Sequence, residues 1–192
     1  MNLIVLPRHC GATLFLFTGI KTMIVAAIFL ILPLCLSFAA LNDLFTMTIP
    51  NRIPLILLFS FMIVAPVSGM DWQTFALSFA AGAVVFVACF ALFAANVMGG
   101  GDAKLLTAAA VWYGFNISVI EFLLAVTFIG GALTIGILLL RTRSREIMAA
   151  GIPVPDSLLV AKKIPYGIGI AIAGLLTYGE TPLVKAAIAS LS

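Results

Sequence analysis

Two aspartates are the residues of this sequence whose positions best suit chemistry. Asp43 follows a long apolar run, and Asp102 lies between three consecutive glycines and another apolar run. Ionisable side chains at membrane depth are expensive, so such residues are functional candidates. If the two carboxyl groups face each other, they cannot both ionise cheaply, and one keeps its proton. The ionised group can then take a proton from water while the protonated group polarises a peptide carbonyl, which is the chemistry of aspartic peptidases.

Other kinds of active site lack the side chains that they need. The one histidine, His9, lies near the start of the sequence, and Cys10, Cys35 and Cys89 form no CxxC pair. Serine, cysteine and metal-dependent mechanisms therefore have no evident partners, and the sequence predicts neither a cofactor nor a metal site. The net charge of +3 is too small to indicate a nucleic-acid partner.

The residues around Asp102 predict a turn that shapes the site. The turn consists of Gly99, Gly100 and Gly101. Without Cβ atoms, these residues permit a sharp bend and the close approach of a substrate strand or another helix. Asp102 is expected at or near the N-cap of a short helix, whose positive end favours the ionised carboxyl. Lys104 is expected to add to that effect or to extend to lipid head groups. In the simpler alternative, Asp102 only caps a helix, Asp43 is an interfacial charge and the glycines only form a turn.

The composition shows which elements must position these residues. Of the 192 residues, 64% are hydrophobic and only 9% are charged, whereas soluble domains are about 45–50% apolar and about 25% charged. A water-soluble fold of this size cannot cover so much apolar surface, so the bilayer must be the solvent. The apolar runs are continuous and longer than barrel strands, which predicts an all-α, polytopic membrane protein.

About six transmembrane helices are expected, given that a span needs about 20 apolar residues. The predicted segments are Met23–Leu41, Ile53–Gly69, Thr74–Asn96, the shorter Ala103–Asn116, Ser118–Leu140 and Ile164–Gly179. Residues 23–192 are predicted to form one membrane-embedded domain. Residues 1–22 form an N-terminal extension, for which an interfacial helix, a signal-like leader and an artefact of the assigned start remain alternatives.

The charges predict how these helices are oriented. If six helices alternate across the membrane, the joints 42–52, 97–102 and 141–163 share one side. Six basic residues lie in these joints: Arg52, Arg141, Arg143, Arg145, Lys162 and Lys163. The positive-inside rule makes that side cytoplasmic, in spite of Lys21 and Lys185 near the other side. Both aspartates then lie at one level, and Trp72, Trp112 and Tyr113 are expected in an aromatic belt at the outer interface.

Three motifs resemble those of the type IV prepilin peptidase family, in particular its short form that serves tight-adherence (Tad/Flp) pili. They are Asp43 followed by Ile49-Pro50-Asn51, then Gly99-Gly100-Gly101-Asp102-Ala103-Lys104-Leu105-Leu106, and, more weakly, Lys163-Ile164-Pro165-Tyr166-Gly167. The resemblance covers about residues 23–180. It implies that Asp43 and Asp102 are the catalytic pair and that Gly99 and Gly101 shape the active-site turn.

The resemblance also implies a substrate and a location. The expected reaction is removal of the short, basic leader of a prepilin or pseudopilin, at the cytoplasmic face of the bacterial inner membrane. The expected partners are this substrate, membrane lipid and the pilus assembly or secretion machinery. Longer members of the family carry a cysteine-containing insertion after the first helix and also methylate the product. The joint 42–52 has no cysteine, which argues against a methyltransferase module.

Three other functions are compatible with an apolar, acid-bearing chain. A presenilin-like protease would carry Tyr-Asp and Pro-Ala-Leu motifs and about nine spans, whereas Asn42 precedes Asp43 and no Pro-Ala-Leu occurs here. A small transporter would place its acids near the bilayer midplane, usually within a symmetric repeat. A non-catalytic membrane subunit of a pilus or secretion complex would tolerate replacement of either aspartate.

Overall fold

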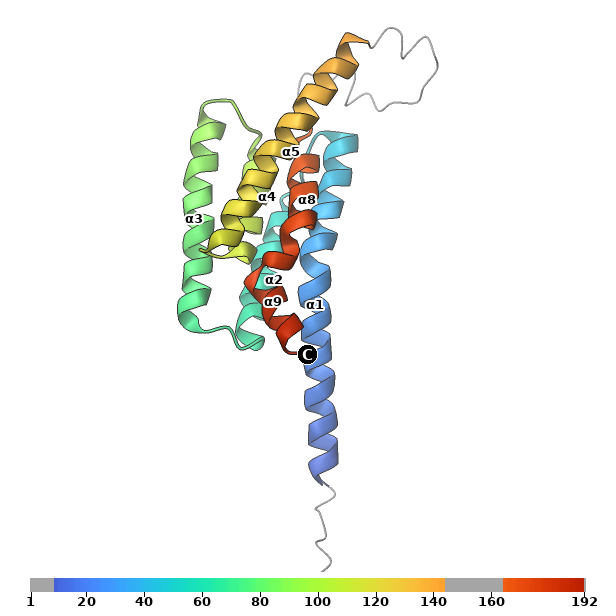
Figure 1. Ribbon diagram of the computed structural model, residues 1–192, viewed down its shortest axis with the longest axis vertical. Coiled ribbons are helices and arrows are strands. Elements are labelled where there is room, and N and C mark those ends of the chain that lie inside the picture. Colours follow the sequence, from blue (N-terminus) through green and yellow to red (C-terminus); the bar gives the residue numbers. More distant parts are fainter. Residues whose placement is uncertain (1–8, 144–163, 192) are drawn as a thin grey trace, which may run out of the picture.

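The computed structural model describes residues 9–143 and 164–191, and within those ranges every regular element is helical (Figure 1). The helices are α1 (His9–Thr46), α2 (Arg52–Val67), α3 (Trp72–Ala94), α4 (Gly100–Tyr113), α5 (Ile117–Thr142), α8 (Tyr166–Thr177), the 3-10 turn η1 (Tyr178–Glu180) and α9 (Pro182–Ala189). The prediction of an all-α fold is confirmed. Each of the six predicted apolar segments forms a helix.

Four of the described segments are long and apolar enough to cross a membrane. They are Lys21–Thr46, Trp72–Ala94, Ile117–Thr142 and Tyr166–Ala189. The last one combines α8, η1 and α9. Helix α2 is apolar but has 16 residues, and α4 has 14, fewer than the roughly 20 that a span requires. The structure therefore supports a polytopic membrane protein, while a count of about six spans stays a prediction.

The short helix α4 lies at the centre of the bundle. Helices α2, α3 and α8 pack against it, and nine of its residues, from Ala103 to Tyr113, are buried. Close packing is possible because small residues line the contacts. A Cβ atom on Gly82 of α3 would lie 2.5 Å from a methyl group of Val111. Because its neighbours cover it, α4 need not be long enough to span the bilayer by itself.

The last turn of α4 is tied to three other helices. The indole N–H of Trp112 donates to the Leu57 carbonyl in α2 at 3.0 Å. The Tyr113 hydroxyl donates to the Gly174 carbonyl in α8 at 2.9 Å, and its ring stacks on Phe122 of α5 at 4.3 Å. The expectation that Trp112 and Tyr113 belong to a lipid-facing aromatic belt is wrong, because both side chains are fully buried. Trp72 is exposed, as that expectation required.

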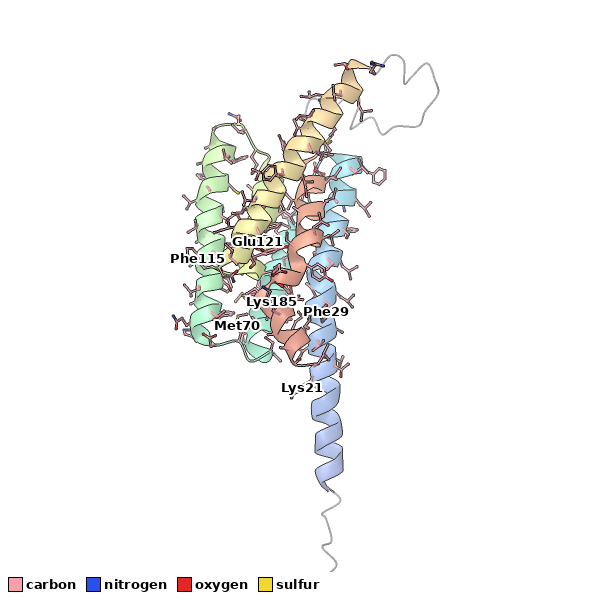
Figure 2. The ribbon with its side chains drawn as sticks, in the orientation of Figure 1. Lys21, Phe29, Met70, Phe115, Glu121 and Lys185 are labelled. Carbon is pink, nitrogen blue, oxygen red and sulfur yellow. The ribbon has the colours of Figure 1, made fainter. Side chains whose placement is uncertain are left out.

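Helix α1 is longer than predicted at both ends. It begins at His9, runs unbroken through Pro33 and ends at Thr46. Figure 1 shows its first part extending beyond the other helices, and Figure 2 shows Lys21 near the point where α1 leaves the bundle. The helix therefore crosses the predicted boundary between residues 22 and 23 without a break. Residues 1–8 lie outside the described residues, and the status of the extension stays open.

The helices alternate in direction, as Figure 1 shows. Helices α1, α3 and α5 end at the same end of the bundle, where α2, α4 and α8 begin. We call this the aspartate end and the other one the opposite end. The first two joints therefore lie at the same end of the bundle, and their place on one side of a membrane stays a prediction. Most of the third joint, including Arg145, Lys162 and Lys163, lies outside the described residues.

Candidate active site

Asp43 lies inside helix α1 rather than in the joint after it. The expected position was a polar loop following residue 41, but the helix continues to Thr46. The Asp43 side chain is 5% exposed. Its Oδ2 accepts a hydrogen bond of 2.7 Å from the backbone N–H of Gly167. Gly167 is in the first turn of α8, where backbone N–H groups have no partner within the helix. The end of α1 and the start of α8 are thus joined through this carboxyl group.

Gly167 makes that contact possible because it has no side chain. A Cβ atom there would lie 2.8 Å from Asp43 Oδ2 and 3.0 Å from Ile49 Cδ1. Contacts below 3 Å do not occur for real Cβ atoms, so any larger residue would displace the carboxyl group or α8. The weaker Pro-Tyr-Gly motif of the sequence therefore contributes to the site through its glycine, a role that the sequence pattern by itself did not indicate.

Asp102 lies in the first turn of α4, where the sequence placed it. The N-cap residue is Gly99, so Asp102 is the third residue of the helix and not the cap itself. An acidic side chain in a first turn is favoured by the unpaired N–H groups and the helix dipole. The Asp102 carboxyl folds back toward the cap, since a Cβ atom on Gly99 would lie 2.7 Å from its Oδ2.

The three glycines permit close packing rather than a sharp bend. Gly99 has φ −71° and ψ 142°, and Gly100 and Gly101 already belong to α4, so none needs a conformation reserved for glycine. The predicted bend is wrong in that respect. The predicted close approach is confirmed, because a Cβ atom on Gly101 would lie 3.2 Å from the Ile49 Cβ and one on Gly100 3.2 Å from the Phe93 ring.

Lys104 joins the two strongest motifs of the sequence. Its Nζ donates to Oδ1 of Asn51 at 2.9 Å. Asn51 is the N-cap residue of α2, yet its side chain makes no capping hydrogen bond to that helix. The amide that would usually cap α2 thus holds α4 near its start. The expected effect of Lys104 on Asp102 and its expected contact with lipid head groups stay predictions.

These contacts surround one cavity of about 590 Å³. Its lining includes Asp43, Asp102, all three glycines, Asn51 and Tyr166, and further comes from Met47, Thr48, Ile49, Phe93, Asn96, Val97, Met98 and Ile164. Both aspartates therefore face the same space, as the topology predicted. Lys104 does not line it. Phe93, Asn96 and Met47 were not indicated by any sequence pattern, because they reach the cavity only through the way their helices end.

The described residues contain no group of three His, Cys, Asp or Glu side chains that would hold a metal ion. The acidic groups of the cavity lining are Asp43 and Asp102. Two carboxyl groups in a common cavity are what general acid–base activation of a water molecule requires.

Comparison with known proteins identifies the class to which this chain belongs. A model of the type IV leader peptidase family matches residues 30–135, which is more than half of the chain and includes both aspartates. The chain therefore belongs to the type IV leader peptidase family, a family of membrane peptidases. No curated protein and no solved structure matches it.

Proposed function

We propose that this chain is an aspartic endopeptidase of the short Tad/Flp type that removes the leader of prepilins or pseudopilins, with Asp43 and Asp102 as its catalytic pair. The observation that carries the proposal is that both carboxyl groups line one cavity at one end of the bundle. They are brought there from opposite directions, by the last turn of α1 and the first turn of α4.

The proposed reaction uses the two carboxyl groups in different protonation states. The ionised carboxylate takes a proton from a water molecule while the water oxygen bonds to the scissile carbonyl carbon. The protonated carboxyl gives its proton to the carbonyl oxygen, which forms a neutral tetrahedral intermediate. When the intermediate collapses, the carbon–nitrogen bond breaks and the leaving nitrogen receives the proton that the first carboxyl took from water. One hydroxyl of the intermediate returns its proton to the other carboxylate, which regenerates the starting pair and leaves a carboxylic acid as product. The Gly167 N–H fixes the orientation of Asp43 throughout.

The charge distribution supports a cytoplasmic position for the cavity. Arg52 begins α2, and Arg141 and Arg143 lie at the end of α5, so all three are at the aspartate end. Asp71 caps α3 at the opposite end. Glu121, near the start of α5, and Glu180, after α8, also lie away from the aspartate end, together with Lys185, which pairs with Glu180 at 2.6 Å. By the positive-inside rule, the aspartate end faces the cytoplasm of a bacterial inner membrane.

The length of the first joint supports the short form of the enzyme. Only residues 47–51 separate α1 from α2, and most of them line the cavity. A methyltransferase module inserted at this point would have to loop out from the cavity wall that these residues form. We therefore propose a peptidase without methylating activity, whose partners are membrane lipid, the Flp-type prepilin and the pilus assembly machinery to which the product passes.

The test is cleavage of a co-expressed Flp-type prepilin in membranes, with the mature N-terminus determined by mass spectrometry. Wild type should cut at a single position. Asp43→Asn and Asp102→Asn keep the side-chain shape and should insert normally without cutting. Cleavage by either variant at the wild-type rate would reject the catalytic pair, and absence of cleavage by wild type with matched substrates would favour the transporter or the non-catalytic subunit.

A further inference from the structure

A second hollow lies on the outer surface of the helix bundle. It measures about 370 Å³ and is lined by Asn51, Pro54, Leu55 and Leu58 of α2 and its cap, Phe86 of α3, and Lys104 and Thr107 of α4. Helix α4 provides its floor, and α2 and α3 provide its walls. We call it the α2–α3 groove. Two of its three polar residues, Asn51 and Lys104, are hydrogen-bonded to each other at the aspartate end.

The groove is closed on the side of the opposite end and open toward the aspartates. Phe61 of α2 contacts Phe75 and Phe79 of α3, with ring centroids 5.8 and 5.9 Å apart. The same ring meets Trp112 of α4 at 5.7 Å. Phe61 is one helical turn beyond Leu58, so this aromatic cluster ends the groove. The hollow itself therefore continues only toward the aspartate end, and it holds only the first turns of a longer helix.

A ladder of three exposed aromatic rings leads from the groove to the cavity. Phe86 lines the groove and Phe93 lines the cavity. Phe90 lies between them, with its ring 5.8 Å from Phe86 and 6.4 Å from Phe93. Residues at this spacing share one face of a helix. All three are close to half exposed, at 47%, 55% and 46% in chain order. Asn51 lines both hollows, so the two spaces are adjacent.

The route between the hollows passes over the first turn of α4. Asp102 and Lys104 are two residues apart, which separates them by about 200° around the helix. The cavity and the groove therefore lie on opposite sides of α4. Gly99, Gly100 and Gly101 line the cavity at this end of α4 and leave the start of the helix without side chains there. A helix is about 10 Å wide, a distance that about three extended residues cover.

We propose that the α2–α3 groove docks the apolar helix of the substrate itself, next to the bond that is cut. This inference rests on the proposed function and adds the place where the substrate binds. A leader followed by an apolar helix reaches a membrane peptidase laterally, through lipid, and the groove is open to lipid at Leu55, which is 50% exposed. Apolar contact alone does not drive helix association in a bilayer, so close packing against rings and small residues must do so. About three extended residues then link the docked helix to the scissile bond over the glycines.

Photo-crosslinking tests this placement directly. The crosslinker p-benzoylphenylalanine replaces Phe90 in the full chain carrying Asp102→Asn, which holds the prepilin uncut in membranes. The matched control replaces Phe38 of α1, which is 58% exposed against 55% for Phe90. We expect at least about fivefold more prepilin adduct from position 90, and competition by unlabelled prepilin.

Three outcomes would overturn the inference: equal prepilin adducts from both positions, adducts of lipid alone from position 90, or adducts only with a second copy of this chain. Cleavage by wild type in the same membranes separates the two proposals. If wild type cuts in an aspartate-dependent manner while position 38 captures the prepilin, the docking site is wrong and the peptidase stands. If wild type does not cut any matched prepilin, both fall.

A kinetic test gives a second readout. Phe86→Ala with Phe90→Ala should raise KM for prepilin about fivefold, with kcat within about twofold, since these rings would hold the substrate equally in the ground state and the transition state. Phe38→Ala should change neither value. A fall in kcat at constant KM would contradict docking at the ladder.

Discussion

Different kinds of residues make the helix–helix contacts at the two ends of the bundle. At the opposite end, α2, α3 and α4 meet through large aromatic rings, with Phe61 in contact with Phe75, Phe79 and Trp112. At the aspartate end, helices meet through glycines and polar groups, with Gly167 against Asp43 and Asn51 against Lys104. Aromatic packing fixes helices relative to one another, whereas helix termini offer unpaired backbone groups that can position charge. We therefore expect the opposite end to contribute to stability and the aspartate end to contribute to the proposed chemistry.

The largest expected effect comes from making the same substitution, aspartate to asparagine, at both ends of the bundle. Asp43→Asn and Asp102→Asn should each lower prepilin cleavage about a thousandfold, because each removes a proton-transferring group. Asp71→Asn is the matched control, since Asp71 caps α3 at the opposite end and accepts from the Thr74 N–H at 2.9 Å. Cleavage rates in membranes, normalised to inserted protein, provide the measurement. A loss with Asp71→Asn comparable to the other two would remove the distinction between the ends.

Replacement by alanine should affect cleavage differently at two helical glycines. Gly167→Ala places a Cβ atom 2.8 Å from Asp43 Oδ2, and a displacement of about 1 Å at a reacting group is enough to lower the rate about a hundredfold. Gly131→Ala in α5 is the control, because nothing lies within 4 Å of its added Cβ atom. That substitution should leave cleavage unchanged and raise thermal stability slightly. Normal cleavage by Gly167→Ala would show that the Asp43 contact does not position the carboxyl group.

A substitution at the opposite end should lower the stability of the protein and leave its rate of prepilin cleavage unchanged. Tyr113→Phe removes the hydroxyl that bonds the Gly174 carbonyl and lies 2.9 Å from the Thr177 hydroxyl. Leaving buried polar groups without this partner costs about 1–2 kcal/mol, which lowers the thermal midpoint by several degrees. Cleavage per folded molecule should stay within about twofold. Unfolding in detergent and cleavage at a temperature below both midpoints distinguish the two readouts, and a loss of rate without a loss of stability would contradict the assignment.

Sequence patterns located the helices and the aspartates but not the contacts between them. Apolar runs of membrane length must form helices, because lipid offers no partner for free backbone groups. The same patterns did not show that Asp43 lies inside α1, since the helix continues through polar residues to Thr46. They also placed Trp112 at a lipid interface, because that rule assumes a helix that spans the bilayer. Helix α4 is short and central, so its last turn is covered by other helices.

Pairings between distant residues were beyond the reach of a single sequence for a different reason. The bond from Gly167 to Asp43 joins residues 124 positions apart, and that from Lys104 to Asn51 joins residues 53 apart. Both depend on which helices are neighbours in the bundle, which hydrophobic patterning in a fully apolar environment does not encode. The motifs indicated that these residues matter, but only the packing shows what each one contacts.

Loss of the Lys104–Asn51 hydrogen bond should have a smaller effect on prepilin cleavage, which tests how far the polar contacts of the aspartate end support the reaction. Lys104→Met keeps the length of the side chain and removes the donor, so the first turn of α4 loses its link to α2 and cleavage should fall about fivefold. Asn51→Leu should cause a similar loss, and the double variant should be no worse than either one, as for residues that act together. Lys185→Met, which breaks the exposed pair with Glu180, is the control and should have no effect. Additive losses would show that the two residues act separately.

The smallest expected effect compares two helix ends within the aspartate end itself. Met47, after α1, has φ 53°, and Asn96, after α3, has φ 57°. Asparagine tolerates this left-handed conformation, whereas a methionine side chain in it is strained by about 1–2 kcal/mol. Glycine removes that strain but gains about 0.5–1 kcal/mol of chain entropy in the unfolded state. Met47→Gly should therefore stabilise the protein by about 0.5 kcal/mol, or about 1–2 °C in the thermal midpoint, and Asn96→Gly should destabilise it slightly. If the thermal midpoint shifts in the same direction in both variants, the Met47 conformation is not strained. In that case the backbone conformation at the end of α1, which forms part of the cavity wall, does not lower the stability of the protein.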